Sequence, residues 1–370
     1  MNGIVAIGLA GMAAMAGLGW WRGWRGLRFA LALAAGWCLG LVPALTGGDT
    51  ASGLRLWAAG AVLLALVGGY TALIARLRRR AAANAETRPG VVGHRPAAAS
   101  SSAPPPMSEV ELDRYARHIV LRELGGPGQQ RLRRARVLVV GAGALGAPVC
   151  LYLAAAGVGR ITIADDDTVS LSNLQRQVLF RDADLGRPKI EAAAETMAAL
   201  NPHIAVNRLG RRITEADVEL VAEHDLVLDG TDSYASRAGT NRACVAARVP
   251  LVAGSIAQWE GQVTVWDPAR DAPCLACLFP EAPAPGLAPS CAEAGVVGAL
   301  PGVVGSVMAL EAIKLIAGAG APLRGRMLVF DGLWGETRTI ALRRDPACPV
   351  CGEAVRPRSS PPPSRSPRPA

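Results

Sequence analysis

The chain has 370 residues, of which 51% are hydrophobic, so it is long enough to bury a full core and to carry further segments. Its formal charge of +9 would suit a nucleic-acid partner only if the basic residues lay on the folded part. Residues 1–106 carry +8 and residues 352–370 carry +3, whereas residues 107–351 carry −2. No nucleic-acid-binding face is therefore expected on the centre of the chain.

Three apolar stretches fill most of the first 80 residues, at 4–21, 27–46 and 54–75. Each is close to the ~20 residues that cross a bilayer as a helix. Arginines lie between the first two stretches and directly after the third, whereas the loop before the third carries only Asp49. The positive-inside rule then places the N-terminus outside and the chain after Arg80 in the cytoplasm. We therefore expect a multi-pass protein of the inner (cytoplasmic) membrane, with residues 1–80 as the transmembrane region.

Other interpretations of this N-terminus stay open. The stretch 4–21 has the length of a signal peptide, but no basic residue precedes it and no clean cleavage site follows. Its Gly and Ala residues insert weakly, so two spans are an alternative to three. A translation start at Met107 would remove the whole segment. The charge asymmetry around the stretches favours a genuine membrane region.

The remainder divides by composition. Residues 81–106 are rich in Ala, Arg, Ser and Pro and predict a disordered linker, and residues 353–370 predict a disordered tail. Between them, residues 107–352 alternate short apolar strand patterns with helical patterns, after a short amphipathic helix near 108–124. This alternation predicts an α/β domain with a doubly wound, mainly parallel, Rossmann-like sheet.

The expected strands are short runs rich in Val, Ile and Leu, and two further segments extend one edge of the sheet in antiparallel fashion. Helices are expected at 147–156 and 188–200. The strands are expected at 137–140, 161–164, 226–229, 251–253 and 263–266, and the edge segments at 327–331 and 336–342.

A glycine-rich loop follows the first expected strand and opens a helix. Gly141, Gly143 and Gly146 permit a tight turn there and let backbone N–H groups approach phosphate oxygens. NAD, FAD and ATP sites share this pattern, so it does not choose among them. Asp165 ends the second strand, where a carboxylate can hold ribose hydroxyls.

Polar residues that suit a polyphosphate come next. Asn173 and Arg176 belong to the run Asn-Leu-Gln-Arg-Gln, and Lys189 lies on the following helix. Arg and Lys neutralise phosphate charge, although an isolated Arg or Lys is usually a surface residue. Asp232 follows a later strand, where it either binds Mg²⁺ beside phosphates or caps the next helix.

Cysteines form two pairs and one isolated residue of interest. Cys274-Leu-Ala-Cys277 and Cys348-Pro-Val-Cys351 have the spacing of a structural four-thiolate zinc site. A pair of disulfides is the alternative, which the expected cytoplasmic location disfavours. Cys291 lies in a loop-like segment, where it can serve as a nucleophile or sulfur carrier.

These motifs, together with Arg114-Tyr-Ala-Arg117 and Asn201-Pro-His, resemble the MoeB/ThiF/HesA family over about residues 107–352. The molybdopterin-synthase adenylyltransferase branch is the most similar. The resemblance implies an ATP-dependent nucleotidyltransferase of the ubiquitin-activating type, in molybdenum-cofactor or thiamine biosynthesis. Its substrate would be a sulfur carrier of the MoaD or ThiS type. The C-terminal Gly-Gly carboxylate of that carrier would be converted into an acyl-adenylate, and pyrophosphate would be released. A separate sulfur donor protein would then form the thiocarboxylate.

The resemblance also implies roles for single residues, and a homodimer whose two sites share arginines across subunits. Cys291 matches a mobile-loop cysteine whose role differs within the family, and Ser233 stands where Asn is common. The membrane region is not part of the family pattern. The implied catalytic residues are Arg117, Arg176, Lys189, Asp232 and Cys291, and the implied nucleotide ligands are Gly141, Gly143, Gly146, Asp165, Asn173, Arg176 and Lys189. The implied metal ligands are Cys274, Cys277, Cys348 and Cys351 for Zn²⁺ and Asp232 for Mg²⁺.

Two other functional classes are weighed against this one. An NAD(P)-dependent oxidoreductase explains the glycine loop and Asp165 but gives no purpose to Arg176, Lys189, Asp232 and the cysteine pairs. A membrane-tethered scaffold without catalysis leaves the same polar residues unexplained.

Overall fold

The computed structural model describes residues 106–284 and 294–352, together with Arg76. The chain divides into two units between Pro89 and Gly90, and all helices and strands named below belong to the second. The expected membrane stretches, the linker up to residue 105 and the tail after residue 352 lie outside the described residues. Those expectations stay predictions.

Two short helices replace the one amphipathic helix expected near 108–124, and a third helix follows them. Helix α5 (Glu109–Arg114) has Ser108 as its N-cap in a capping box with Glu111, and α6 (Ala116–Ile119) follows. Helix α7 (Gly125–Arg134) starts after a turn. The buried Tyr115 separates α5 from α6, and its hydroxyl accepts a hydrogen bond from Asn201 Nδ2 at 2.8 Å. The break between the two short helices therefore coincides with a side chain that is buried in the domain.

Strands of the described residues form one eight-stranded sheet in the order β3-β2-β1-β4-β5-β6-β7-β8. The five strands from β3 to β5 are parallel, and the order reverses between β1 and β4, as in a Rossmann-like fold. The mixed α/β architecture is as expected. The strands are β1 (Arg136–Val140), β2 (Arg160–Ala164), β3 (Ala205–Leu209), β4 (Leu226–Asp229), β5 (Leu251–Ala257), β6 (Glu260–Trp266), β7 (Arg326–Asp331) and β8 (Glu336–Ala341).

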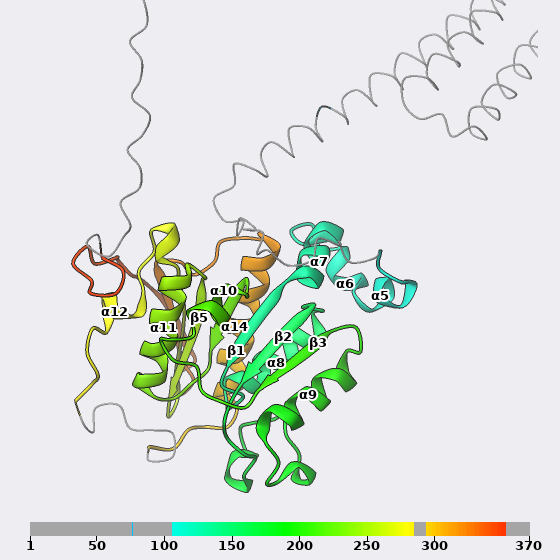
Figure 1. Cartoon of the computed structure of the whole chain (residues 1–370), viewed down its shortest axis with the longest axis horizontal. Helices are drawn as coiled ribbons and strands as arrows, with labels where there is room; N and C mark the ends of the chain where they lie inside the picture. Colours follow the sequence, from blue (N-terminus) through cyan, green and yellow to red (C-terminus); the bar gives the residue numbers. More distant parts are fainter. Residues whose placement is uncertain (1–75, 77–105, 285–293, 353–370) are drawn as a thin grey trace, which may run out of the picture. The chain divides into compact units, whose positions relative to one another are not determined.

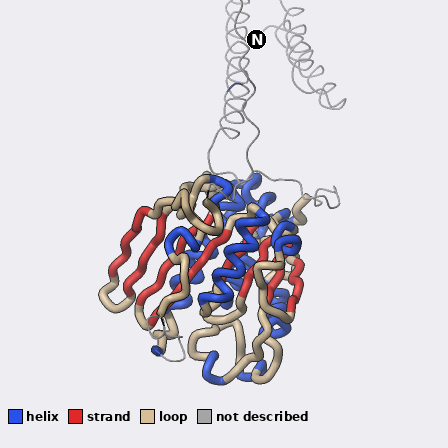
Figure 2. The backbone as a smooth tube through the Cα atoms, turned by 60° about the vertical axis from the view of Figure 1, so that its left-hand side comes forward, coloured by secondary structure: helices blue, strands red, loops and turns tan. Residues whose placement is uncertain are grey.

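Helices cover both faces of the parallel strands (Figures 1 and 2). One face packs against α7, α8 (Gly146–Ala155), α9 (Lys189–Leu200) and α14 (Leu300–Ala317), which share one apolar core. The other face packs against α10 (Val218–Ala222) and α11 (Tyr234–Ala247), which share a second core. The central strands β1, β2 and β4 are covered on both sides, which explains why these strands are rich in Val, Ile and Leu.

Strand β6 differs from the expected parallel set. It pairs antiparallel with β5 through a tight turn at Gln258 and Trp259, and β7 and β8 continue the antiparallel order. The connection is too short for the crossover that two parallel strands need. The antiparallel edge formed by β7 and β8 is as expected.

Helix α14 is the one helix among the described residues with the length and apolar composition to cross a bilayer. Within the domain, however, 61% of the helix Leu300–Ala317 is buried. Its side chains Met308 and Leu315 are fully buried in the core beside the sheet. The composition of α14 is therefore explained by packing inside the domain.

Candidate functional site

A cavity of about 420 Å³ lies at the carboxyl ends of β1, β2 and β4, and we call it the strand-end cavity. This is the point where the strand order reverses, which is where ligands bind in doubly wound sheets. The structure thus brings together residues that are far apart in sequence. The predicted residues that line it are Gly141, Gly143, Asp165, Asn173, Arg176, Lys189 and Asp232.

The glycine loop wraps the end of β1 against the start of α8. Gly141 has a φ of +87°, a conformation that side chains disfavour. A Cβ on Gly146 would lie 1.8 Å from the carbonyl oxygen of Gly141, so this position requires glycine for the close approach of helix and strand. Gly146 therefore acts through packing, since it does not itself line the cavity.

Asp165 is held by the backbone at the mouth of this loop. Its Oδ2 accepts a hydrogen bond from the Ala142 N–H at 2.7 Å, and its Oδ1 accepts one from the Asp167 N–H at 2.8 Å. Both bonds orient the carboxylate toward the cavity that it lines. Each oxygen keeps a free lone pair, which suits ribose hydroxyls.

Lys189 is the buried cation of the site. Its side chain is only 5% exposed, and its Nζ donates to Asp167 Oδ2 at 2.8 Å. Asp167 supplies the counter-charge that a buried ammonium group requires. Since Lys189 lines the cavity, a bound polyphosphate would offer a second anionic partner.

Two cavity arginines were missed by the sequence reasoning. Arg212 follows β3 and donates from Nε to both oxygens of Asp166, at 2.9 and 3.1 Å. Arg237 lies on α11 and donates from Nε and Nη2 to the Thr231 carbonyl, at 3.0 and 2.7 Å. No local motif marks either residue, because only the fold brings their segments to the cavity.

Asp232 does not cap helix α11. Ser233 is the N-cap, and its Oγ accepts from the Ser236 N–H at 3.2 Å. The helix-cap alternative for Asp232 is therefore wrong, and its exposed carboxylate lines the cavity. The preceding Asp229 is buried, which raises the pKa of its carboxyl group, and it accepts hydrogen bonds from Thr231 that shape this turn.

Two of the predicted catalytic residues are not placed in the cavity. Arg117 lies exposed on α6 and is absent from the residues that line the cavity of the single chain. Cys291 lies outside the described residues, so its role stays a prediction.

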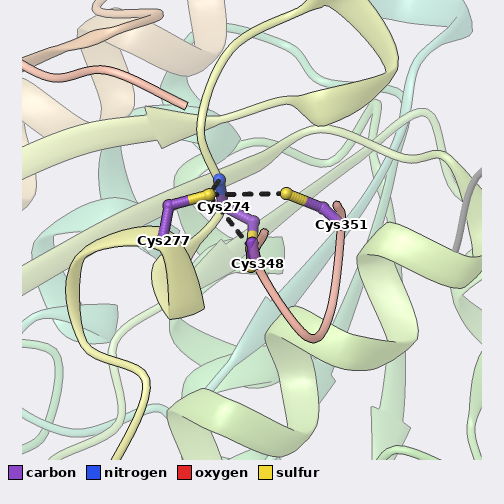
Figure 3. Close-up of side chains that lie close together, drawn as sticks. All are labelled: Cys274, Cys277, Cys348 and Cys351. Atoms are coloured by element: carbon purple, nitrogen blue, oxygen red, sulfur yellow. Dashed lines mark hydrogen bonds between the residues drawn. The ribbon is translucent and has the colours of Figure 1, made fainter. Parts of the chain in front are cut away.

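The four paired cysteines meet in one cluster (Figure 3). The Sγ–Sγ distances are 3.7 Å for Cys274 and Cys348, 4.0 Å for Cys274 and Cys277, and 3.4 Å for Cys277 and Cys351. Zinc at ~2.3 Å from each of four tetrahedral sulfurs would place these sulfurs about 3.8 Å apart. All four are free thiols, so the disulfide alternative is not adopted. The spacing therefore fits a four-thiolate metal site.

The cluster joins two distant segments of the domain. Cys274 and Cys277 flank the short helix α12 (Leu275–Leu278), whereas Cys348 and Cys351 follow β8. Burial raises the pKa of the Cys277 thiol to about 11. A zinc ion would displace such protons, because thiolates are the ligands that it binds.

Comparisons with known proteins agree with this geometry. A family model described as the ThiF family matches residues 115–350. This chain belongs to the ThiF family. A sulfur carrier protein adenylyltransferase of Thermus thermophilus is 48% identical to this ThiF-family chain over 248 residues, which cover 66% of the chain and 92% of that protein. The molybdopterin-synthase adenylyltransferase of Escherichia coli is 46% identical over 251 residues, or 67% and 99% of the two chains.

A third relative and the solved structures extend the comparison. The ThiS adenylyltransferase of Escherichia coli is 45% identical over 247 residues, which cover 66% of this chain and 97% of that protein. The structure of Escherichia coli MccB with ATP has a TM-score of 0.56 at 23% identity and covers 64% of this chain and 74% of that one. PaaA has a TM-score of 0.57 at 21% identity and covers 82% and 89%. The two structures support the fold alone.

Proposed function

We propose that this protein uses ATP to adenylylate the C-terminal Gly-Gly carboxylate of a ubiquitin-like sulfur-carrier protein of the MoaD or ThiS type. The observation that carries the proposal is the strand-end cavity, which combines a glycine loop with Asp165, Lys189 and Asp232. The named relatives are adenylyltransferases of such carriers. A nicotinamide oxidoreductase would have no use for this collection of cations and an exposed carboxylate.

The reaction follows from the charges of the site. A carboxylate oxygen of the carrier attacks the α-phosphorus of ATP, and the bond from that phosphorus to the bridging oxygen breaks, so that pyrophosphate leaves. Lys189 and Arg176 are placed to neutralise the charge that develops on the phosphate oxygens. Asp165 would hold the ribose and Asn173 the phosphates. Asp232 would hold Mg²⁺, which shields polyphosphate charge when bound.

A second, much smaller cavity of about 40 Å³ lies beside the strand-end cavity. Arg237 lines both cavities, so the second adjoins the first at this side chain. Ser255 and Gln262 contribute polar groups to its wall, and Phe279 and Met327 contribute apolar ones.

Pyrophosphate exchange into ATP tests this function directly. We expect exchange with a MoaD- or ThiS-type carrier and none without it or with a carrier lacking the final glycines. Carrier-independent exchange, or reduction of NAD(P), would contradict the assignment. The carrier that supports exchange at the lowest concentration identifies the pathway.

We also propose that the active form is a homodimer in which Arg117 reaches the cavity of the partner subunit. Arg117 is exposed on α6 and does not line its own cavity. Separate Arg117→Ala and Asp232→Ala proteins should each be inactive in pyrophosphate exchange. When they are mixed and allowed to exchange subunits, half of the dimers carry one intact site, so about one quarter of the wild-type rate should return. A mixture that stays inactive would place Arg117 in the cavity of its own chain.

The apolar N-terminus supports a proposal for location. We infer that residues 1–80 anchor the domain to the inner membrane with the catalytic domain in the cytoplasm, where ATP is available. The full chain should therefore stay with membranes after carbonate extraction, whereas a chain starting at Met107 should be released. Release of the full chain would contradict the anchor.

We also propose that the four-cysteine cluster binds Zn²⁺.

A further inference from the structure

Two neighbouring hairpin tips expose large apolar side chains that neither the core nor the strand-end cavity uses. The turn between β5 and β6 carries Trp259, which is 44% exposed. The turn between β7 and β8 carries Leu333 at 54% and Trp334 at 76% exposure. We call these three residues the hairpin-tip surface. Clustered exposed aromatic side chains are typical of protein interfaces, where burying them supplies much of the binding energy.

The two tips are joined to each other. Gly332 N–H donates to the Trp259 carbonyl at 2.8 Å, and a Cβ built on Gly332 would lie 3.9 Å from the Trp259 ring. Asp331 Oδ1 accepts hydrogen bonds from the Leu333 N–H at 2.9 Å and the Trp334 N–H at 3.1 Å. The turn is thus ordered before any partner arrives, which lowers the entropy cost of binding.

The hairpin-tip surface lies at the same edge of the sheet as the strand-end cavity. Strand β5 is parallel to β4, so its carboxyl end points to that edge, and β7 points the same way. Ile256 near the end of β5 lines the cavity. Trp259 follows three residues later, so the two Cα atoms are at most about 11 Å apart. An extended peptide covers that distance with three to four residues, at roughly 3.3 Å each.

Charge at the tips distinguishes between classes of partner. The residues that flank the tips on the paired strands are Glu260, Asp331 and Glu336. Carboxylates there disfavour an anionic lipid surface, which attracts basic segments. They favour a protein that presents an apolar patch with a basic rim.

We propose that the hairpin-tip surface is the docking surface for the folded body of the sulfur-carrier protein, whose C-terminal tail then enters the strand-end cavity. This inference rests on the proposed function and adds where the carrier is held. The tail needs to bridge only the short distance from Trp259 to Ile256. Docking on the tips is therefore separable from the chemistry at the tail.

Binding of a carrier without its final Gly-Gly to the detergent-solubilised full chain tests the docking step alone. We expect Trp334→Ser to weaken this binding by about 30-fold, as for a central interface tryptophan, and to raise the KM for intact carrier while the KM for ATP is unchanged. Glu336→Lys should weaken binding by a smaller factor that grows at low salt. The matched control is Leu200→Ser, at an exposed leucine of α9 beside the opposite edge strand β3, which should bind normally.

Each other outcome would overturn the docking surface. Unchanged carrier affinity in Trp334→Ser and in Trp259→Ser would show that the carrier binds elsewhere. A change in oligomeric state would assign the tips to a subunit interface, and Trp334-dependent quenching by brominated lipids would assign them to the membrane. If no carrier supports pyrophosphate exchange with the unmodified protein, the proposed function itself fails. If exchange persists with an unchanged KM in the variants, only the docking surface fails.

Discussion

Replacing Lys189 by methionine is expected to lower kcat/KM for carrier adenylylation by about 10²–10³-fold, the usual effect of removing one group that stabilises transition-state charge. Lys189 is the buried cation of the strand-end cavity, and its ammonium group lies 2.8 Å from Asp167. Pyrophosphate exchange over a range of carrier concentrations measures the effect.

The fold should survive this substitution. Methionine fills a similar volume, and Asp167 is 59% exposed, so water can hydrate the carboxylate that loses its partner. We expect the melting temperature to change by only a few degrees. Asp167→Asn is the matched variant, because it removes the same ion pair but keeps the ammonium group, and it should retain far more activity. A Lys189→Met protein within tenfold of the wild-type rate would remove Lys189 from the catalytic residues.

Replacing Cys348 by serine is expected to release the metal and to lower the melting temperature by ~10 °C or more. Loss of a bound structural metal is among the few changes that cost upwards of about 4 kcal/mol. For a domain of this size each 1 kcal/mol shifts the melting temperature by ~2–4 °C. The cluster is the link between α12 and the segment after β8, so that segment should lose protection from proteolysis.

Metal content by elemental analysis and thermal unfolding check this expectation. The wild-type chain should hold one zinc ion, and Cys348→Ser should hold none. Cys150→Ala is the control, because it also removes a buried thiol but lies on α8, away from the cluster. A wild-type protein free of zinc, or a Cys348→Ser protein that keeps it, would contradict the four-thiolate site.

Local patterns predicted most of the sheet but not its weakest strand. Strands β1, β2 and β4 were recognised because they are rich in Val, Ile and Leu and buried on both faces. Strand β3, with sequence Ala-Val-Asn-Arg-Leu, was missed because it is an edge strand and largely exposed, so no apolar run marks it. The direction of β6 was also missed, because periodicity does not distinguish parallel from antiparallel strands.

The site shows the same division between local and long-range information. Gly141 and Asp165 were predicted because each follows a strand, and Asn173 and Lys189 because each belongs to a polar local motif after the second strand. Arg212, which follows β3, and Arg237, which lies on α11, were missed because they reach the cavity only through the topology of the sheet. Arg117 was predicted by resemblance, but the fold of a single chain leaves it outside the cavity.

By itself, the sequence determined that the centre of the chain forms an α/β domain with a glycine loop, a polar Asn-Leu-Gln-Arg-Gln run and two cysteine pairs. Such features are encoded by neighbouring residues, whose spacing dictates turns, strands and ligand pairs. The tertiary structure decided that cysteines more than 70 residues apart meet, as Cys274 and Cys348 do at 3.7 Å. It also decided that Lys189 pairs with Asp167 and that two hairpin tips place Trp259 beside Gly332. Those contacts depend on how strands and helices pack over long sequence separations, which no local pattern records.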